Sequence, residues 1–161
     1  MKNRSVIGAS GETVELLSAN GRFLARAAYS PHSQIRARVW TFDPSEPVQA
    51  DFFRQRIRTA IASRETLHVR RDTDALRLIH AESDGLPGLI VDRYAGVLVA
   101  QFLSAGAEFW RETIAELLVE ETGLGFIYER SDADVRELEG LPARSGALYG
   151  ALPAAAPLVA A

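Results

Sequence analysis

The chain has 161 residues, of which 47% are hydrophobic and 24% are charged, a composition typical of a soluble globular protein rather than a disordered one. It contains no cysteine, which excludes disulfides and all thiolate chemistry. The N-terminus lacks the apolar run of a signal peptide and no stretch reaches the length of a membrane span, so we expect a cytoplasmic protein with no membrane partner.

Charge is distributed unequally along the chain. Residues 1–71 contain 12 Lys or Arg and 6 Asp or Glu, whereas residues 72–161 contain 6 and 15, which gives balances of +6 and −9. This contrast predicts either two units with different partners, the first suited to a polyanion, or a simple drift of surface charge between domains.

Residues 12–42 are predicted to form strands. Residues 12–17 and 22–29 flank Ser18-Ala19-Asn20-Gly21, and Asn-Gly is a strong signal for a tight β-hairpin. A third strand follows at residues 34–42. Three antiparallel strands suggest a small β-barrel but are too few to close one, so we expect the remaining strands to be missing or to lie upstream.

The third strand is the best candidate for a functional surface. Strand alternation places Ile35, Ala37 and Val39 on one face and Arg36, Arg38 and Trp40 on the other. Arginines neutralise phosphates and an exposed indole stacks on bases, which favours RNA binding. The alternative is that a neighbouring element buries Trp40 and that the arginines only keep a sheet edge soluble.

An amphipathic helix is predicted over residues 50–64, because its apolar residues recur at helical spacing. Its other faces carry four arginines, which suit either a solvated surface or contact with phosphate; these are Arg54, Arg56, Arg58 and Arg64.

The acidic half predicts a compact α+β unit. Strands are expected at residues 76–81, 89–94, 97–102 and 126–130, with a helix from about 107 to 121 that stops at Gly123. Residues 151–161 are of low complexity and are expected to be a linker or a ragged terminus.

Two local patterns allow chemistry but have simpler explanations. His80, Glu82, Asp84 and Asp92 permit an acid–base or metal site, although carboxylates before a Gly-Leu-Pro-Gly turn commonly cap backbone groups. The segment that begins at Ser104 precedes a helix, where backbone amides can meet an anion or Ser104 can cap the helix.

Four ordered motifs carry a family resemblance. They are residues 29–40 (YSPHSQIRARVW), 82–93 (ESDGLPGLIVDR), 103–108 (LSAGAE) and 128–132 (YERSD). Over about residues 11–150 the chain resembles the bacterial large-subunit (23S) ribosomal RNA cytosine-C5 methyltransferases. That family combines a PUA domain, a central β-β-α-β-β domain and a Rossmann-like domain that binds S-adenosylmethionine.

The resemblance implies a partial PUA-like barrel followed by the central α+β domain, without the Rossmann-like domain. It assigns residues 1–42 to a truncated PUA-like RNA-binding domain, 43–71 to a linker and helix, 72–140 to the central domain and 141–161 to a linker or tail. Ribosomal RNA is the implied partner. The candidate RNA-binding residues are Arg36, Arg38 and Trp40, followed by Arg22, Arg26 and Tyr29.

No catalytic, cofactor-binding or metal residue is transferred from the family. Cytosine-C5 methylation needs a thiolate, which this chain lacks, and no Gly-rich turn follows a strand to hold the cofactor. We therefore expect an RNA-binding portion of a methyltransferase that is inactive alone and whose RNA affinity falls steeply with salt.

Two other hypotheses are retained. In one, a separate chain supplies the missing methyltransferase domain, or the protein forms a homo-oligomer. In the other, the chain is a small hydrolase that uses Glu82 and Asp84 with His80.

Overall fold

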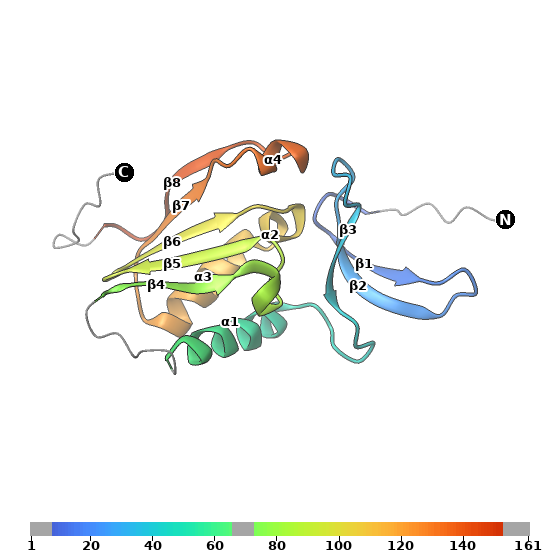
Figure 1. Ribbon diagram of the computed structural model, residues 1–161, viewed down its shortest axis with the longest axis horizontal. Helices are drawn as coiled ribbons and strands as arrows, with labels where there is room; N and C mark the ends of the chain where they lie inside the picture. The colour runs from blue at the N-terminus through green and yellow to red at the C-terminus, as the bar shows by residue number, and fades with distance from the viewer. Residues whose placement is uncertain (1–7, 66–72, 153–161) are drawn as a thin grey trace.

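The computed structural model describes residues 8–65 and 73–152, which form a three-stranded sheet beside a five-stranded sheet with helices (Figure 1). The three-stranded sheet contains β1 (Thr13–Leu17), β2 (Phe23–Tyr29) and β3 (Ala37–Thr41), all antiparallel. The predicted hairpin is confirmed, because Gly21 has a φ of +83° at the turn and Ser18 N donates to Arg22 O at 2.8 Å. The third strand is shorter than expected.

The five-stranded sheet has the order β4-β5-β6-β7-β8. Its strands are β4 (Ala75–His80), β5 (Leu89–Tyr94), β6 (Val97–Phe102), β7 (Ile127–Ser131) and β8 (Arg144–Tyr149). Only β6 and β7 run parallel, and helices make the crossover between them. The expected α+β class is confirmed.

The helix predicted at residues 107–121 is two helices. α2 (Ala105–Phe109) and α3 (Arg111–Thr122) meet at Trp110, whose ψ of 8° lies outside helical geometry. The Trp110 ring packs on Phe53 with 4.9 Å between centroids. α3 ends at Gly123 as predicted, with a φ of +70°.

Three further elements complete the fold. α1 (Ala50–Glu65) agrees with the predicted helix, and a 3-10 turn, η1 (Ala81–Asp84), occupies the predicted turn. α4 (Val135–Leu138) and β8 were not predicted. Because β8 pairs antiparallel with β7, the sheet extends past residue 140 into the segment expected to be a linker. Residues 153–161 of that segment lie outside the described residues.

One hydrophobic core joins the two sheets. α1 and α3 pack together against the face of the larger sheet that carries Val91, Ala100 and Ile127. Ala28 and Trp40 of the smaller sheet belong to the same buried cluster. No helix within residues 8–65 and 73–152 is long and apolar enough to cross a membrane.

Candidate nucleic-acid interface

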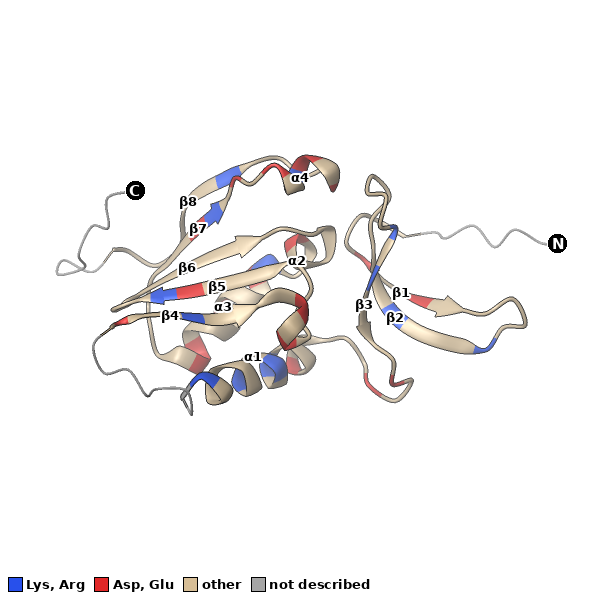
Figure 2. Ribbon diagram, in the orientation of Figure 1, with Lys and Arg blue, Asp and Glu red and all other residues tan. Residues whose placement is uncertain are grey.

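Three of the four arginines of α1 are bound to the acidic half of the chain, and the fourth, Arg56, pairs with Glu46 at 2.9 Å. Arg54 and Arg58 contact Glu121 at 2.9 and 2.6 Å, and Arg64 holds Asp84 with two bonds of 2.5 and 2.7 Å. In Figure 2, basic and acidic segments are accordingly interspersed over both sheets and their helices. Part of the positive charge of the first half is therefore used in ion pairs with the second half. These arginines already have carboxylate partners within the protein.

Tyr29 and Arg36 form a pair at one end of β2. The Arg36 guanidinium donates to the Tyr29 hydroxyl at 3.0 Å and lies 5.7 Å from the ring centroid. Arg36 is exposed, as is Ile35 beside it in the chain, with 52% of its surface accessible. Arg36 forms no ion pair with a carboxylate of the described residues.

Arg38 and Trp40 share a face as predicted, but that face is turned toward the rest of the protein. Trp40 is only 4% exposed and packs edge-on against Phe53, with 5.3 Å between centroids. Arg38 donates to the carboxylate of Glu139 at 3.0 Å and lies 3.6 Å from Glu82. Of the two sequence alternatives, burial by a neighbouring element is the one observed for Trp40.

Arg22 and Arg26 lie toward the other end of β2. Arg26 pairs with Glu15 at 3.2 Å and also donates to the carbonyl of Glu46 at 2.7 Å. Arg22 is exposed, and within the described chain its side chain forms no hydrogen bond or ion pair. Arg22 and Arg36 are thus the accessible unpaired cations of the three-stranded sheet.

A buried carboxylate that the sequence did not single out anchors the loop between β2 and β3. Glu139, 1% exposed, accepts hydrogen bonds from the Ser30 hydroxyl, from Arg38 and from the Ala105 amide at 3.1 Å. Burial alone would raise the pKa of Glu139, but these hydrogen bonds outweigh it and hold the pKa below the ordinary 4.5. The backbone amide at the start of α2, where the sequence allowed an anion to bind, therefore meets the carboxylate of Glu139.

Glu139 could not be singled out from the sequence, because its segment is rich in charged residues and nothing in it predicts burial. The segment Arg136-Glu137-Leu138-Glu139-Gly140 has the composition of a solvated turn. Its partner Ser30 lies 109 residues away in the chain, and no local pattern predicts such a pair. The one local signal is Gly140, whose φ of +70° allows the chain to pass against the ring of His32.

The carboxylates of the hydrolase hypothesis have structural partners. Asp84 is held by Arg64 and accepts from the His80 amide at 2.6 Å, while Asp92 is held by Arg77 at 2.8 and 3.0 Å. No group of His, Asp and Glu within the described ranges could hold a metal ion. These carboxylates thus accept a hydrogen bond from the backbone or pair with arginines, which is the simpler of the two explanations that the sequence allowed.

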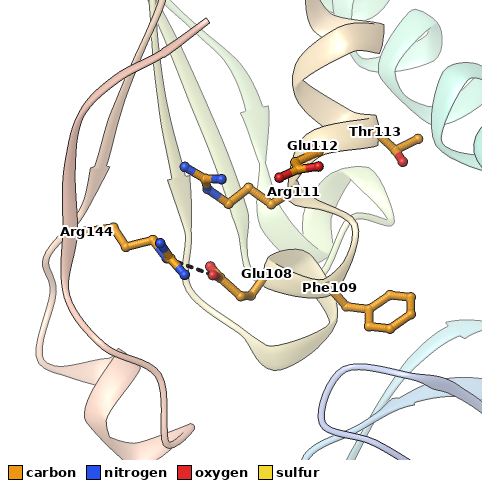
Figure 3. Close-up of a pocket in the computed structure, with 6 residues that line it drawn as sticks. All are labelled: Glu108, Phe109, Arg111, Glu112, Thr113 and Arg144. Carbon is orange, nitrogen blue, oxygen red and sulfur yellow. Dashed lines mark hydrogen bonds and ion pairs between the residues drawn. The ribbon is translucent and has the colours of Figure 1, made fainter.

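An open pocket of about 260 Å³ lies beside α2 and α3 (Figure 3). Arg144 reaches across it and donates to Glu108 at 2.9 Å, and Arg111 is bound to the buried Glu129 at 2.5 Å. Phe109 points away from these side chains, as Figure 3 shows. Both guanidiniums already have carboxylate partners, so the pocket has no free cation for an anionic ligand.

Comparison with known proteins identifies the fold. Residues 3–42 match the model of a PUA-like domain. The whole fold is similar to a putative SAM-dependent methyltransferase from Streptococcus mutans, with a TM-score of 0.74 at 17% identity, covering 92% of this chain and 37% of that one. It is also similar to a putative methyltransferase, SMU.776, that was crystallised with SAH, with a TM-score of 0.71 and the same coverage. The chain thus has a PUA-like segment and the fold of part of these methyltransferases.

The curated relatives give the family. The chain is 54% identical over 144 residues to ribosomal RNA large subunit methyltransferase I of Shewanella amazonensis and 53% identical over 143 residues to that of Aliivibrio fischeri. These matches cover 89% of this chain but 36% of each relative. Over the part that it covers, the chain is similar to the large-subunit ribosomal RNA methyltransferases, as the motifs had indicated, and it spans about a third of their length.

Proposed function

We propose that this chain is the RNA-binding portion of a methyltransferase that acts on large-subunit ribosomal RNA. The observation that carries the proposal is the 52–54% identity to the curated methyltransferases over nine-tenths of the chain. The exposed cations of the three-stranded sheet, Arg22 and Arg36, supply the contact with RNA. Arg38 and Trp40 support that sheet from inside, Arg26 ties it to the following loop, and Tyr29 positions Arg36.

Methyl transfer itself falls outside what the described residues can do. A nucleotide-type cofactor needs a turn after a parallel strand whose amides are free to receive it. The one such crossover in the described chain starts at Ser104, where the Ser104 hydroxyl accepts from Ala107 N at 3.2 Å and Glu139 accepts from Ala105 N. The described residues therefore do not fit S-adenosylmethionine, and the chain holds no cysteine for attack on a cytosine ring.

RNA binding is tested by fluorescence anisotropy with a labelled fragment of large-subunit ribosomal RNA. The double variant Arg22→Ala/Arg36→Ala is expected to bind about tenfold or more weakly, since each arginine contributes roughly 1 kcal/mol or more. Arg130→Ala is the control, because Arg130 is also exposed but lies on β7. Equal affinity of the double variant and the wild type would contradict the proposal.

A further inference from the structure

The surface proposed to bind RNA contains few free positive charges. Of the arginines within the described ranges, only Arg22, Arg36 and Arg93 form no ion pair with a carboxylate. Arg22 precedes β2 and Arg36 follows its far end, which separates them by the length of a seven-residue strand, roughly 20 Å. No continuous basic track runs across the sheet for a duplex to follow.

Recognition of double-stranded RNA depends on many contacts to phosphates and 2′-hydroxyls along the helix. The three-stranded sheet offers two isolated guanidiniums for this, and its remaining arginines are held by Glu15, Glu139 and Glu82. An extended duplex would therefore gain little from this surface. Affinity must come from contacts of another kind.

The end of the sheet near Tyr29 has the chemistry that suits a single base. The guanidinium plane of Arg36 is held by the Tyr29 hydroxyl, and Ile35 adds an exposed apolar side chain. Aromatic rings and arginine planes stack on unpaired bases, each such contact contributing roughly 1–3 kcal/mol. The Arg36 cation, which has no carboxylate partner among the described residues, can meet the phosphate of the same nucleotide.

The loop that carries these side chains is fixed before any ligand arrives. Ser30 N donates to Arg36 O at 2.9 Å and closes the loop, while Ile35 N donates to the Ser33 hydroxyl at 3.1 Å. The Ser30 hydroxyl donates to the buried Glu139, which anchors the base of the loop. A loop that is already ordered loses less conformational entropy on binding.

We propose that Tyr29, Ile35 and Arg36 form a site for an unpaired nucleotide, so that the chain prefers single-stranded or loop RNA to duplex RNA. This inference rests on the proposed RNA-binding function and names its substrate class. It also revises the steep salt dependence expected from the sequence, because Arg36 contributes one phosphate contact and stacking is insensitive to salt.

The test compares three labelled RNAs of equal length, one single-stranded, one a hairpin with an open loop and one fully paired duplex. Anisotropy titrations are expected to show at least tenfold tighter binding of the single-stranded and hairpin RNAs than of the duplex. Equal or tighter binding of the duplex overturns the inference while leaving RNA binding intact. Binding of none of the three overturns the proposed function instead.

Two variants separate stacking from charge. Arg36→Ala should lower single-strand affinity and reduce the slope of log K against log salt by about 0.7, the value for one phosphate contact. Arg36→Lys should keep that slope but lose at least threefold in affinity, since an ammonium cannot replace the guanidinium plane. Full affinity in Arg36→Lys would show that charge alone matters and would contradict the stacking site.

Discussion

Glu139 joins four parts of the structure through one buried carboxylate. It follows α4 and accepts hydrogen bonds from the loop after β2, from β3 and from the first turn of α2. Removal of one partner from a buried ion pair leaves the other charge uncompensated, at a cost of about 3 kcal/mol. The position of the loop that presents Arg36 thus depends on a residue that does not reach the surface.

Glu139→Gln is expected to lower the free energy of unfolding by about 3 kcal/mol in urea titrations at pH 7. Since the folded pKa of Glu139 lies below 4.5, its contribution is complete above that pH and is lost as the pH falls through the folded value. The variant should therefore lose less stability than the wild type over this acid range. Glu137→Gln, a change at an exposed position of α4 just before Glu139, is the control. Equal stability of the two variants would refute the anchoring role.

At the scale of elements, local signals in the sequence predicted most of the structure. Asn20-Gly21 located the hairpin, and helical spacing located α1. Alternation correctly placed Arg38 and Trp40 on one face, but alternation cannot show whether another element covers that face. Here α1 and α2 cover it: α1 follows β3 after a short loop, whereas α2 lies much farther along the chain.

Elements that depend on distant partners were not predictable. β8 contains Ser145, Gly146 and Ala147, which give no strand signal of their own, and it forms because β7 offers an unpaired edge. The break between α2 and α3 is set by the fit of Trp110 against Phe53. The candidate site was only partly predictable for the same reason. Ion pairs to Glu139 and Glu15 decide which arginines remain free, and the sequence does not show these pairs.

The contact between α2 and the three-stranded sheet requires a residue without a side chain. A Cβ at Gly106 would lie 2.4 Å from the Ala28 Cβ and 2.7 Å from Trp40 Cζ2, so Gly106→Ala must push the helix away. We expect a loss of roughly 1–3 kcal/mol in thermal or urea unfolding, despite the better helix propensity of alanine. Gly96→Ala is the control, because nothing lies within 4 Å of a Cβ there. Similar stability of both variants would show that the contact is loose.

For the whole molecule, the shared core matters more than the division into segments. The sequence predicts a boundary at residue 42, yet Trp40 on one side of it packs with Phe52 and Phe53 on the other. The ion pairs of Arg38 with Glu139 and with Glu82 cross the same boundary. Both kinds of contact bind the three-stranded sheet to the larger unit.

This arrangement predicts that the two sheets unfold together. Far-UV circular dichroism reports both sheets, whereas tryptophan fluorescence reports the junction that contains Trp40 and Trp110. In urea, the two signals should follow one transition with the same midpoint, as expected for a cooperative domain of this size. If the three-stranded sheet were an independent domain, its loss would precede the main transition. Fluorescence would then change at lower urea than most of the circular dichroism, and Glu139→Gln would widen the separation, because that variant weakens the junction while leaving the core of the five-stranded sheet untouched.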